Sequence, residues 1–421
     1  MSFDTLGLHP KILKAVSAAG YDKPTDIQLK AIPKIVRGFD LRASAQTGTG
    51  KTAAFLLPAL HRLVTPSKQS GNGPRVLILV PTRELAMQIM QQAEKYSRFL
   101  QKQKTVCIVG GVPYPKQLRD LSRPCDVLIA TPGRLIDFID QKKISFSRLE
   151  MLVLDEADRM LDMGFQKPVE KIVGETPKER QTLLFSATLQ GSVVKLSEKL
   201  LTKPMEITVH GEKARNENIK QTVHYVDDLN HKNRLLDHIL AQDGVLNTIV
   251  FTSTKRHADQ LVKELRDKGH MTGALHGDMN QRQRTRTIAQ LKNGKISVLV
   301  ATDVAARGID VQSISHVINF DLPNNAEDYV HRIGRTGRAG AQGSAFSFVG
   351  SRDAHLIKQI KAFTGQPLEA EVIQGLEPTG KKSAAAPFRR KRTPNGGRRR
   401  FSKSPPKPRG KKQGHRKGKR Q

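Results

Sequence analysis

The sequence predicts an α/β protein with two parallel-sheet domains in tandem and a disordered, basic C-terminal tail. Short apolar runs recur along most of the 421 residues, and each leads through a polar or glycine-bearing turn into a helical stretch. Such runs, alternating with helices, are typical of parallel sheets that helices cover on both faces. The pattern stops around residues 210–217 and ends after about residue 378, so we expect a linker at the first place and a tail at the second.

The first forty residues are expected to form helices in pieces. One helix ends at Gly20, and a proline-broken loop then enters a second helix with Ile27, Ala31 and Ile35 on one face. Gln28 lies in the first turn of that second helix. From the pattern alone, Gln28 is adequately interpreted as an exposed polar residue.

Each domain contains a series of apolar runs that we interpret as strands. In the first domain they span residues 41–45, 76–80, 106–109, 127–130, 151–154 and 182–185. In the second they span residues 222–226, 248–251, 272–275, 298–301, 316–320 and 344–348. Because the carboxyl ends of parallel strands meet at one edge of a sheet, the polar residues after these runs should gather on one rim. The predicted boundaries are an N-terminal segment at 1–40, domains at 41–208 and 219–376, a linker at 209–218 and the tail at 377–421.

The first predicted strand leads into a loop with the composition of a phosphate-binding loop. It reads Ala45-Gln46-Thr47-Gly48-Thr49-Gly50-Lys51-Thr52. Its glycines let backbone amides turn toward phosphate oxygens, and the helix that follows adds its N-terminal dipole. Lys51 would contact the outer phosphates of a bound nucleotide, and the Thr52 hydroxyl would bind Mg²⁺. The alternative is a solvated turn of glycine and threonine before a helix.

A second candidate site follows the apolar run at 151–154. Asp155 and Glu156 fall at the carboxyl end of that predicted strand, where open parallel sheets bind ligands. Phosphoryl transfer needs a carboxylate to hold Mg²⁺ and another group to orient or deprotonate the attacking water. We assign Asp155 to the metal and Glu156 to the water. A lone Asp-Glu pair would be a solvated turn, but its pairing with a phosphate-binding loop favours a nucleotide-hydrolysing site.

The second domain has no phosphate-binding loop of its own, but it carries a cationic run at residues 331–338. Arg335 and Arg338 are spaced by small residues, which suits arginines that reach a γ-phosphate across a cleft. An arginine of this kind is typically worth ~10³ to 10⁵ in rate, so hydrolysis would depend on domain closure. The alternative is a solvated basic helix face.

The charge of the chain indicates a polyanionic partner. The formal net charge is +32 and 37% of the residues are hydrophobic, which suits a folded protein that binds nucleic acid. The segment Lys381–Gln421 holds 18 Lys or Arg and no acidic residue, so we expect a disordered tail that binds nucleic acid by neutralising phosphates. The alternatives for the tail are a solubilising role or binding to any acidic surface.

Cysteine usage and hydropathy indicate the compartment. Cys107 and Cys125 form no disulfide or metal-binding pattern, which favours buried thiols in a reducing environment. No apolar run reaches the length of a membrane span, and the N-terminus has no basic, apolar leader. We therefore expect a soluble, cytoplasmic protein with no membrane partner.

Taken together, these motifs resemble those of the DEAD-box RNA helicases over about four fifths of the chain, from Phe3 to Val349. The family's namesake tetrapeptide is Asp155-Glu156-Ala157-Asp158, and the short form with a basic tail is most similar to the bacterial RhlE-type subgroup. The resemblance implies two RecA-like domains and ATP-dependent, local unwinding of short RNA duplexes or remodelling of RNA–protein complexes. RNA would stimulate ATP hydrolysis by favouring closure of the two domains.

Carried over by position, the resemblance implies roles for individual residues. Those that would recognise the adenosine moiety are Tyr21, Gln28 and, at the ribose, Asp310. Those that would complete the ATP site from the second domain are His331, Arg335 and Arg338. Those that would couple hydrolysis to strand separation are Asp158, Ser186 and Thr188. Those that would lie along the RNA are Pro81, Thr82, Arg83, Gly110, Gly111, Thr131, Pro132, Gly133, Arg134, Thr252, Ser253, Gln281, Arg284 and Thr302.

Three other functions are compatible with the same residues. The first is an ATP-gated RNA clamp or annealing chaperone, in which unwinding is incidental. The second is a non-enzymatic RNA-binding scaffold that uses the tail alone, and the third is a DNA translocase. The RhlE-like resemblance suggests ribosome assembly, RNA turnover or cold adaptation, with ribosome precursors or the RNA-decay machinery as partners.

Overall fold

The computed structural model describes residues 2–45, 48–67, 70–71, 73–100, 103–189, 191–209, 218–242, 244–306, 311, 314–337 and 341–379. The segment Met1–Lys381 forms one compact unit, which contains both predicted domains. We call these domains the first and second lobes. Most of the predicted tail and most of the predicted linker lie outside the described residues.

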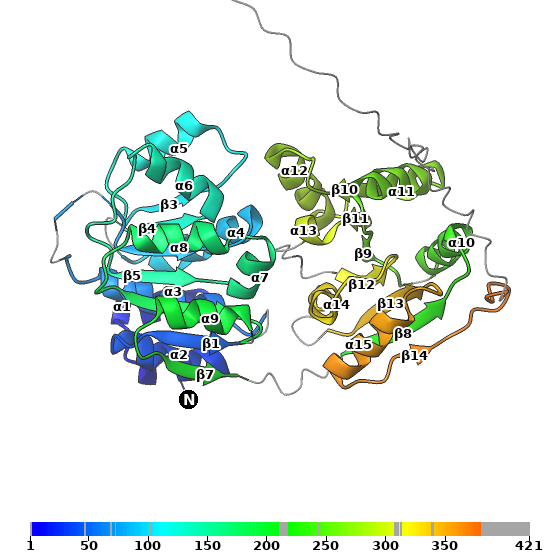
Figure 1. The fold of residues 1–421 in the computed structure, drawn as a ribbon, viewed down its shortest axis with the longest axis horizontal. Helices are drawn as coiled ribbons and strands as arrows, with labels where there is room; N and C mark the ends of the chain where they lie inside the picture. Colours follow the sequence, from blue (N-terminus) through cyan, green and yellow to red (C-terminus); the bar gives the residue numbers. More distant parts are fainter. Residues whose placement is uncertain are drawn as a thin grey trace, which may run out of the picture. The chain divides into compact units, whose positions relative to one another are not determined.

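The first lobe is built on a parallel sheet whose described strands follow the order β3-β4-β2-β5-β6-β1-β7 (Figure 1). The strands are β1 (Leu41–Ser44), β2 (Val76–Leu79), β3 (Thr105–Ile108), β4 (Val127–Ala130), β5 (Met151–Leu154), β6 (Gln181–Ser186) and β7 (Met205–Thr208). The apolar runs predicted for this domain correspond to β1 through β6. The edge strand β7 has no such run, because Ile207 is its only buried residue.

Alternate residues of these strands pack against two different layers of helices. On β5, Met151 and Val153 belong to one apolar core, whereas Leu152 and Leu154 belong to the other. The helices of the first core are η1 (Phe3–Leu6), α1 (Pro10–Ala18), α2 (Asp26–Val36), α3 (Lys51–Leu63) and α4 (Arg83–Ser97). Those of the second are α5 (Tyr114–Leu121), α6 (Pro132–Asp140), α7 (Ala157–Asp162), α8 (Gln166–Gly174) and α9 (Ser192–Leu200).

The second lobe repeats the strand order of the first. Its described strands follow the order β10-β11-β9-β12-β13-β8-β14, and every pair is parallel. The strands are β8 (Ile219–Tyr225), β9 (Asn247–Phe251), β10 (Thr272–Leu275), β11 (Val298–Ala301), β12 (Ile314–Asn319), β13 (Gly343–Val349) and β14 (Glu369–Ala370). The short edge strand β14 is exposed and has no apolar run, so the sequence pattern did not predict it.

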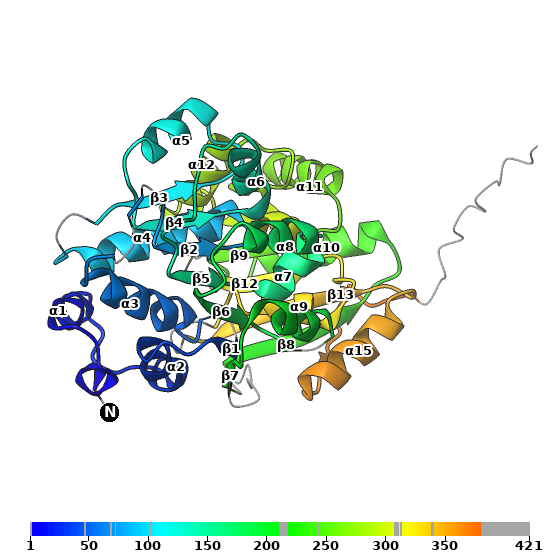
Figure 2. The same cartoon turned by 60° about the vertical axis from the view of Figure 1, so that its left-hand side comes forward.

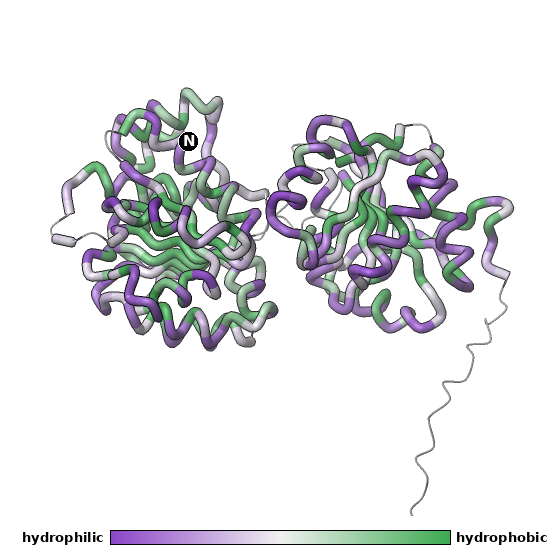
Figure 3. The backbone as a smooth tube through the Cα atoms, turned by 90° about the horizontal axis from the view of Figure 1, so that it is seen from above, coloured by the Kyte–Doolittle hydropathy of each residue, from purple (hydrophilic) through white to green (hydrophobic). Residues whose placement is uncertain are grey.

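Helices cover this second sheet on both faces. They are α10 (Leu229–Leu240), α11 (Lys255–Asp267), α12 (Gln281–Lys292), α13 (Asp303–Ala306), α14 (Ala326–Ile333) and α15 (Ala354–Thr364). Figure 2 shows the same arrangement for the first sheet, with α1, α2 and α3 on one side and α7, α8 and α9 on the other. Figure 3 shows hydrophobic residues concentrated along the strands and hydrophilic residues along the outer helices. The two-domain α/β prediction is therefore confirmed.

The two cysteines are free thiols; Cys125 is buried and Cys107 is partly buried. Burial raises the pKa of the Cys107 thiol to about 12 and that of Cys125 to about 11, so both stay protonated and unreactive at neutral pH. None of the described helices is both long and apolar enough to cross a bilayer.

Candidate active site

The predicted phosphate-binding loop joins β1 to α3. The Ala45 amide donates to the Ser186 carbonyl at 3.0 Å, which fixes the start of the loop beside the end of β6. Gly48 and Gly50 have φ values of +87° and +91°, a left-handed backbone that glycine adopts without strain. Lys51 is then the first residue of α3 and is buried. Gly48, Gly50 and the N-terminus of this 13-residue helix line one cavity, and a helix N-terminus favours an anion there. Gln46 and Thr47 lie outside the described residues.

Gln28 is buried and tied to this loop, so the exposed alternative is wrong. Its Nε2 donates to the Gly50 carbonyl at 3.1 Å, and its Oε1 accepts from the Thr25 amide at 3.0 Å. Thr25 and Gln28 form the capping box of α2, a signal that the sequence contained at the expected spacing. A Cβ on Gly50 would collide with the Gln28 amide group, so this position requires glycine.

A cavity of about 390 Å³ opens over the loop. Its lining includes the predicted residues Tyr21, Gln28, Gly48, Gly50, Lys51, Thr52, Asp155, Glu156 and Arg335. The tyrosine is exposed, and its ring centroid lies 6.2 Å from that of Tyr96. Other lining residues, which sequence reasoning missed, are Phe3, Lys23, Gln88 and Gln92. The sequence around Phe3 does not indicate that this residue lines a cavity. Phe3 reaches the cavity only because η1 packs there.

Asp155 follows β5 directly, and its amide donates to the Leu79 carbonyl at 3.0 Å. Burial raises the pKa of the Asp155 carboxyl to about 6, while the positive charge of Lys51 opposes that rise. A nearby cation would stabilise the ionised form of this buried carboxylate. The described residues contain no cluster of three or more metal-ligating side chains. Mg²⁺ is commonly held by one or two protein ligands together with phosphate oxygens and water. Asp155 with the Thr52 hydroxyl fits that pattern.

Glu156 occupies an unusual backbone position. Its φ is +53°, in the left-handed region, at the N-cap of α7. Non-glycine residues in that region cost of order 1–3 kcal/mol and cluster at functional sites. Burial by itself would raise the pKa of Glu156, but the charges of Arg159 and Lys51 outweigh it and lower the pKa to about 2. The carboxylate is therefore ionised at neutral pH, as a general base must be.

Asp158 connects α7 to the end of β6. Its Oδ2 accepts hydrogen bonds from the amides of Ala187 at 2.9 Å and Thr188 at 3.2 Å. The Ser44 hydroxyl also donates to the Ala187 carbonyl, at 3.1 Å. The Thr188 amide also donates to the Ser186 hydroxyl, at 3.4 Å. Asp158, Ser186 and Thr188, which we expect to couple hydrolysis to strand separation, therefore lie together, next to the predicted phosphate-binding loop and the predicted base.

The second lobe contributes α14 and the turn after it. Burial, reinforced by the charge of Arg159, lowers the pKa of His331 to about 4, so the imidazole is neutral at pH 7. Arg335 is buried, and its Nε donates to the His331 carbonyl at 3.1 Å. Arg335 lines the cavity over Lys51, and its role as an arginine finger stays a prediction. Arg338 and Asp310 lie outside the described residues.

The predicted RNA contacts of the first lobe gather at one edge of its sheet. They follow β2, β3 and β4, which are neighbours in the strand order. Gly111 has a φ of +75°, and a Cβ there would strike the Arg83 guanidinium, so glycine is required for this close approach. Arg134 donates from Nη1 to the Val112 carbonyl at 3.1 Å, which ties the loop after β3 to α6.

The predicted contacts of the second lobe follow β9 and β11, which are also neighbours, and lie on α12. The Ser253 amide donates to Asp321 Oδ2 at 2.9 Å. Arg284 donates from Nε to Glu84 Oε1 at 2.7 Å and from Nη2 to the Ala305 carbonyl at 3.1 Å. Its charge is therefore neutralised by a carboxylate of the first lobe, and its role toward RNA stays a prediction.

Two protein-family models match this chain, one in each lobe. The DEAD/DEAH box helicase family model matches residues 25–196, and the helicase conserved C-terminal domain model matches residues 231–340. The ATP-dependent RNA helicase SrmB of Haemophilus influenzae is 45% identical over 380 residues, which is 90% of this chain and 86% of that protein. The ATP-dependent RNA helicase DeaD of Mycobacterium tuberculosis is 44% identical over 89% of this chain, which spans 66% of that relative.

Solved structures of two other proteins share the fold of this chain. Dbp5 of Saccharomyces cerevisiae, bound to RNA and ADP BeF3, aligns with a TM-score of 0.79 at 32% identity, over 88% of this chain and 95% of that one. Mss116p bound to ssRNA and AMP-PNP aligns with a TM-score of 0.80 at 30% identity, over 89% of this chain and 81% of that one. With both family models matched in order and relatives this similar over most of its length, the chain belongs to the DEAD-box family of ATP-dependent RNA helicases.

Proposed function

We propose that the protein hydrolyses ATP in the cavity over Lys51 and uses closure of its two lobes to separate short RNA duplexes. One observation carries the proposal: Lys51, Glu156 and Arg335, from both lobes, line the same cavity. Hydrolysis that needs all three residues would depend on how the lobes meet. RNA that favours their meeting would then stimulate hydrolysis, because ligands that prefer the same state raise each other's affinity.

The proposed roles combine the places of these residues in the cavity with the roles that the family resemblance implies. Lys51 and the backbone amides of the loop would hold the phosphate oxygens, and Gln28 with Tyr21 would hold the adenine. When bound, Mg²⁺, held by Thr52 and Asp155, would neutralise phosphate charge. Glu156 would accept the proton of the attacking water on its carboxylate, with Oε2 already held by Arg159. Arg335 would stabilise charge that develops on the outer phosphate, together with Arg338.

Separation of the RNA strands would be coupled to hydrolysis through Asp158. Its carboxylate holds the amides of Ala187 and Thr188, so a shift of α7 after hydrolysis would move the end of β6. The RNA contacts that we predict are backbone amides, threonines and arginines at strand ends. Such groups contact phosphate and 2′-OH and ignore base sequence. The expected activity is therefore sequence-independent and specific for RNA.

Phosphate release and displacement of a short RNA duplex test this function. The full chain should show RNA-stimulated phosphate release and ATP-dependent displacement. Lys51→Ala should lose both, whereas Lys167→Ala, which changes an exposed lysine of α8, should lose neither. An RNA clamp or annealing chaperone would bind RNA with ATP and leave the duplex intact. If duplex DNA stimulated turnover as strongly as RNA, the substrate assignment would be wrong.

For the cellular role, we propose work on ribosome precursors or on RNA turnover in the cytoplasm, in the manner of the RhlE-type subgroup. The support is the net charge of +32 and the basic segment 377–421, which suits non-specific binding to long RNA. Crosslinking the protein to RNA in cells and sequencing the bound fragments tests this role. Enrichment of ribosomal RNA precursors or decay intermediates is expected, and their absence from the bound fragments would contradict it.

A further inference from the structure

Arg159, on α7, contacts the predicted base directly. Its Nη1 donates to Glu156 Oε2 at 2.7 Å, and the two side chains are only 3% and 9% exposed. The residues are three positions apart, so the turn that starts the helix sets their spacing. Lys51 also carries positive charge toward Glu156, but Arg159 is the residue hydrogen-bonded to its carboxylate. The arginine is therefore placed to determine where this carboxylate points.

Glu156 needs a fixed hydrogen-bond partner if its carboxylate is to keep one orientation. The left-handed backbone at the N-cap of α7 places the side chain at the cavity, as the lining of that cavity shows. The backbone alone does not determine the side-chain torsions of Glu156, which can adopt several staggered rotamers. A base works only within hydrogen-bond reach of the proton that it takes. A donor fixed on the same helix removes the rotamers that point the carboxylate elsewhere.

The opposite edge of Arg159 lies against the second lobe. Its Nε and Nη2 atoms are buried and have no hydrogen-bond partner among the described residues. A small cavity there is lined by Arg159 together with Asp303, His331 and Arg332 of the second lobe. Arg332 is already held by two hydrogen bonds to Asp303, at 2.6 and 2.7 Å. In this arrangement the only hydrogen bond described for the Arg159 guanidinium is the one to Glu156.

We propose that Arg159 is a positioning residue for ATP hydrolysis, which holds the Glu156 carboxylate in the orientation that accepts a proton from the attacking water. This inference rests on the proposed function. Arg159 acts through Glu156, because it does not itself line the nucleotide cavity. A misplacement of about 1 Å in a reacting group can cost about 10²-fold in rate. Loss of Arg159 should therefore lower kcat on that scale and leave the binding of ATP and RNA nearly unchanged.

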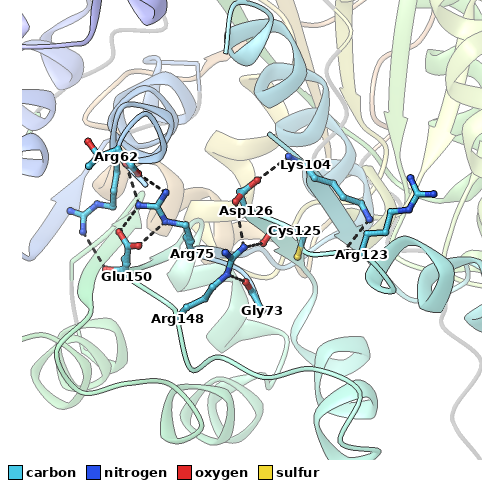
Figure 4. A network of polar contacts seen from close by, with 10 residues as sticks. Arg62, Gly73, Arg75, Lys104, Arg123, Cys125, Asp126, Arg148 and Glu150 are labelled. Carbon is cyan, nitrogen blue, oxygen red and sulfur yellow. Dashed lines mark hydrogen bonds and ion pairs between the residues drawn. The ribbon is translucent and has the colours of Figure 1, made fainter. Parts of the chain in front are cut away.

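The test compares Arg159→Met and Arg159→Lys with a matched control in the same lobe. Arg75 is the control: its side chain is 6% exposed, and its Nε donates to Glu150 Oε1 at 2.7 Å (Figure 4). Neither Arg75 nor Glu150 lines the nucleotide cavity. RNA-stimulated phosphate release is measured for each full-length variant and divided by the number of ATP-binding sites found by equilibrium titration. This division removes any fraction of the protein that fails to fold.

The expected result is a kcat per site about 10²-fold lower in Arg159→Met, with the KM for ATP within about threefold of the parent protein. Arg159→Lys should recover part of the rate, because a cation at that place still binds the carboxylate. Arg75→Met should lose thermal stability but keep its kcat per site. In the double variant Arg159→Met/Glu156→Gln, the rate should be no lower than in Glu156→Gln alone, as for residues that act as a unit.

Two results would overturn the inference. One is an unchanged kcat per site in Arg159→Met, and the other is an effect that adds in full to that of Glu156→Gln. A parent protein without RNA-stimulated phosphate release would instead overturn the proposed function. Because the parent protein is measured in the same series, the two failures are distinguishable.

Discussion

Arg284 donates from Nε to Glu84 Oε1 at 2.7 Å, so a buried ion pair joins two residues that stand 200 positions apart. Glu84 lies in the first turn of α4, beside the predicted RNA contacts of the first lobe, and Arg284 lies on α12 of the second lobe. Gln281 also donates to Glu84 Oε1, at 3.3 Å. The contact links the predicted RNA edge of one lobe to a helix of the other.

Removing one partner of this pair should weaken the coupling between RNA binding and ATP hydrolysis. In Arg284→Met the Glu84 carboxylate stays buried without its counter-charge when the lobes meet, and breaking a buried pair typically costs about 3 to 5 kcal/mol. We expect RNA-stimulated phosphate release to fall by at least tenfold while the basal rate changes little. Lys171→Met, which removes the exposed ion pair with Asp140, is the control and should behave as the parent protein. Equal losses of the basal and stimulated rates in Arg284→Met would contradict this interpretation.

Glu156→Gln should separate binding from chemistry. The amide cannot accept the proton of the attacking water, but its shape still fits beside Arg159. We expect ATP and RNA affinities close to those of the parent protein and a slowed release of RNA, because the complex with both ligands cannot turn over. Fluorescence anisotropy with labelled RNA measures the lifetime of that complex. Rapid turnover in the variant would remove Glu156 from its role as the base.

Gln28→Ala should impair both a helix cap and the nucleotide site. Loss of a capping interaction costs roughly 1 kcal/mol of stability, and loss of the bond to the Gly50 carbonyl frees the loop before Lys51. The matched control is Gln283→Ala, which breaks the capping box of α12 in the second lobe. Both variants should melt at lower temperature than the parent protein, and only Gln28→Ala should raise the KM for ATP. An equal rise of KM in both would indicate a general loss of folding.

Asp321 should contribute to the acid stability of the second lobe. Burial alone would raise the pKa of its carboxyl, but hydrogen bonds from His257, Lys232 and Ser253 outweigh burial and hold the pKa well below its usual range. Since the folded pKa is depressed, this stabilisation is complete above the unfolded pKa of about 3.9 and is lost as pH falls through the folded value. Asp321→Asn should therefore melt at lower temperature than the parent protein at pH 7. The gap should narrow below about pH 4, and a gap independent of pH would contradict the assignment.

Deletion of residues 381–421 should weaken RNA binding without affecting the core ATPase. The segment carries 18 Lys or Arg, and each phosphate that it neutralises adds about 0.7 to the slope of log affinity against log salt for a single strand. We expect a shallower salt slope and an unchanged basal rate of phosphate release. Affinity titrations at several salt concentrations measure the slope. A slope equal to that of the full chain would show that the tail does not bind the RNA.

The strands of this protein could be predicted because its parallel sheets are covered on both faces. Runs such as Met151–Leu154 are buried on both sides, so they read as continuous apolar segments, and the motifs that follow them could be placed on one rim. The edge strands β7 and β14 are largely exposed and carry no such signal. Lys51 and Asp155 could be assigned from sequence because their chemistry is tied to local turns at the ends of strands.

By itself, then, the sequence determined the two lobes and the places of the predicted phosphate-binding loop and the acidic motif, since each depends on neighbours within one turn or one strand. The tertiary structure decided which distant groups meet: Phe3 and Gln28 at the cavity over Lys51, Arg284 on Glu84, and the second lobe beside Arg159. These contacts depend on how whole elements pack, and packing joins residues that no local periodicity relates. The charges on both sides of such contacts are visible in the sequence, but their pairing depends on burial and distance, which only the folded chain defines.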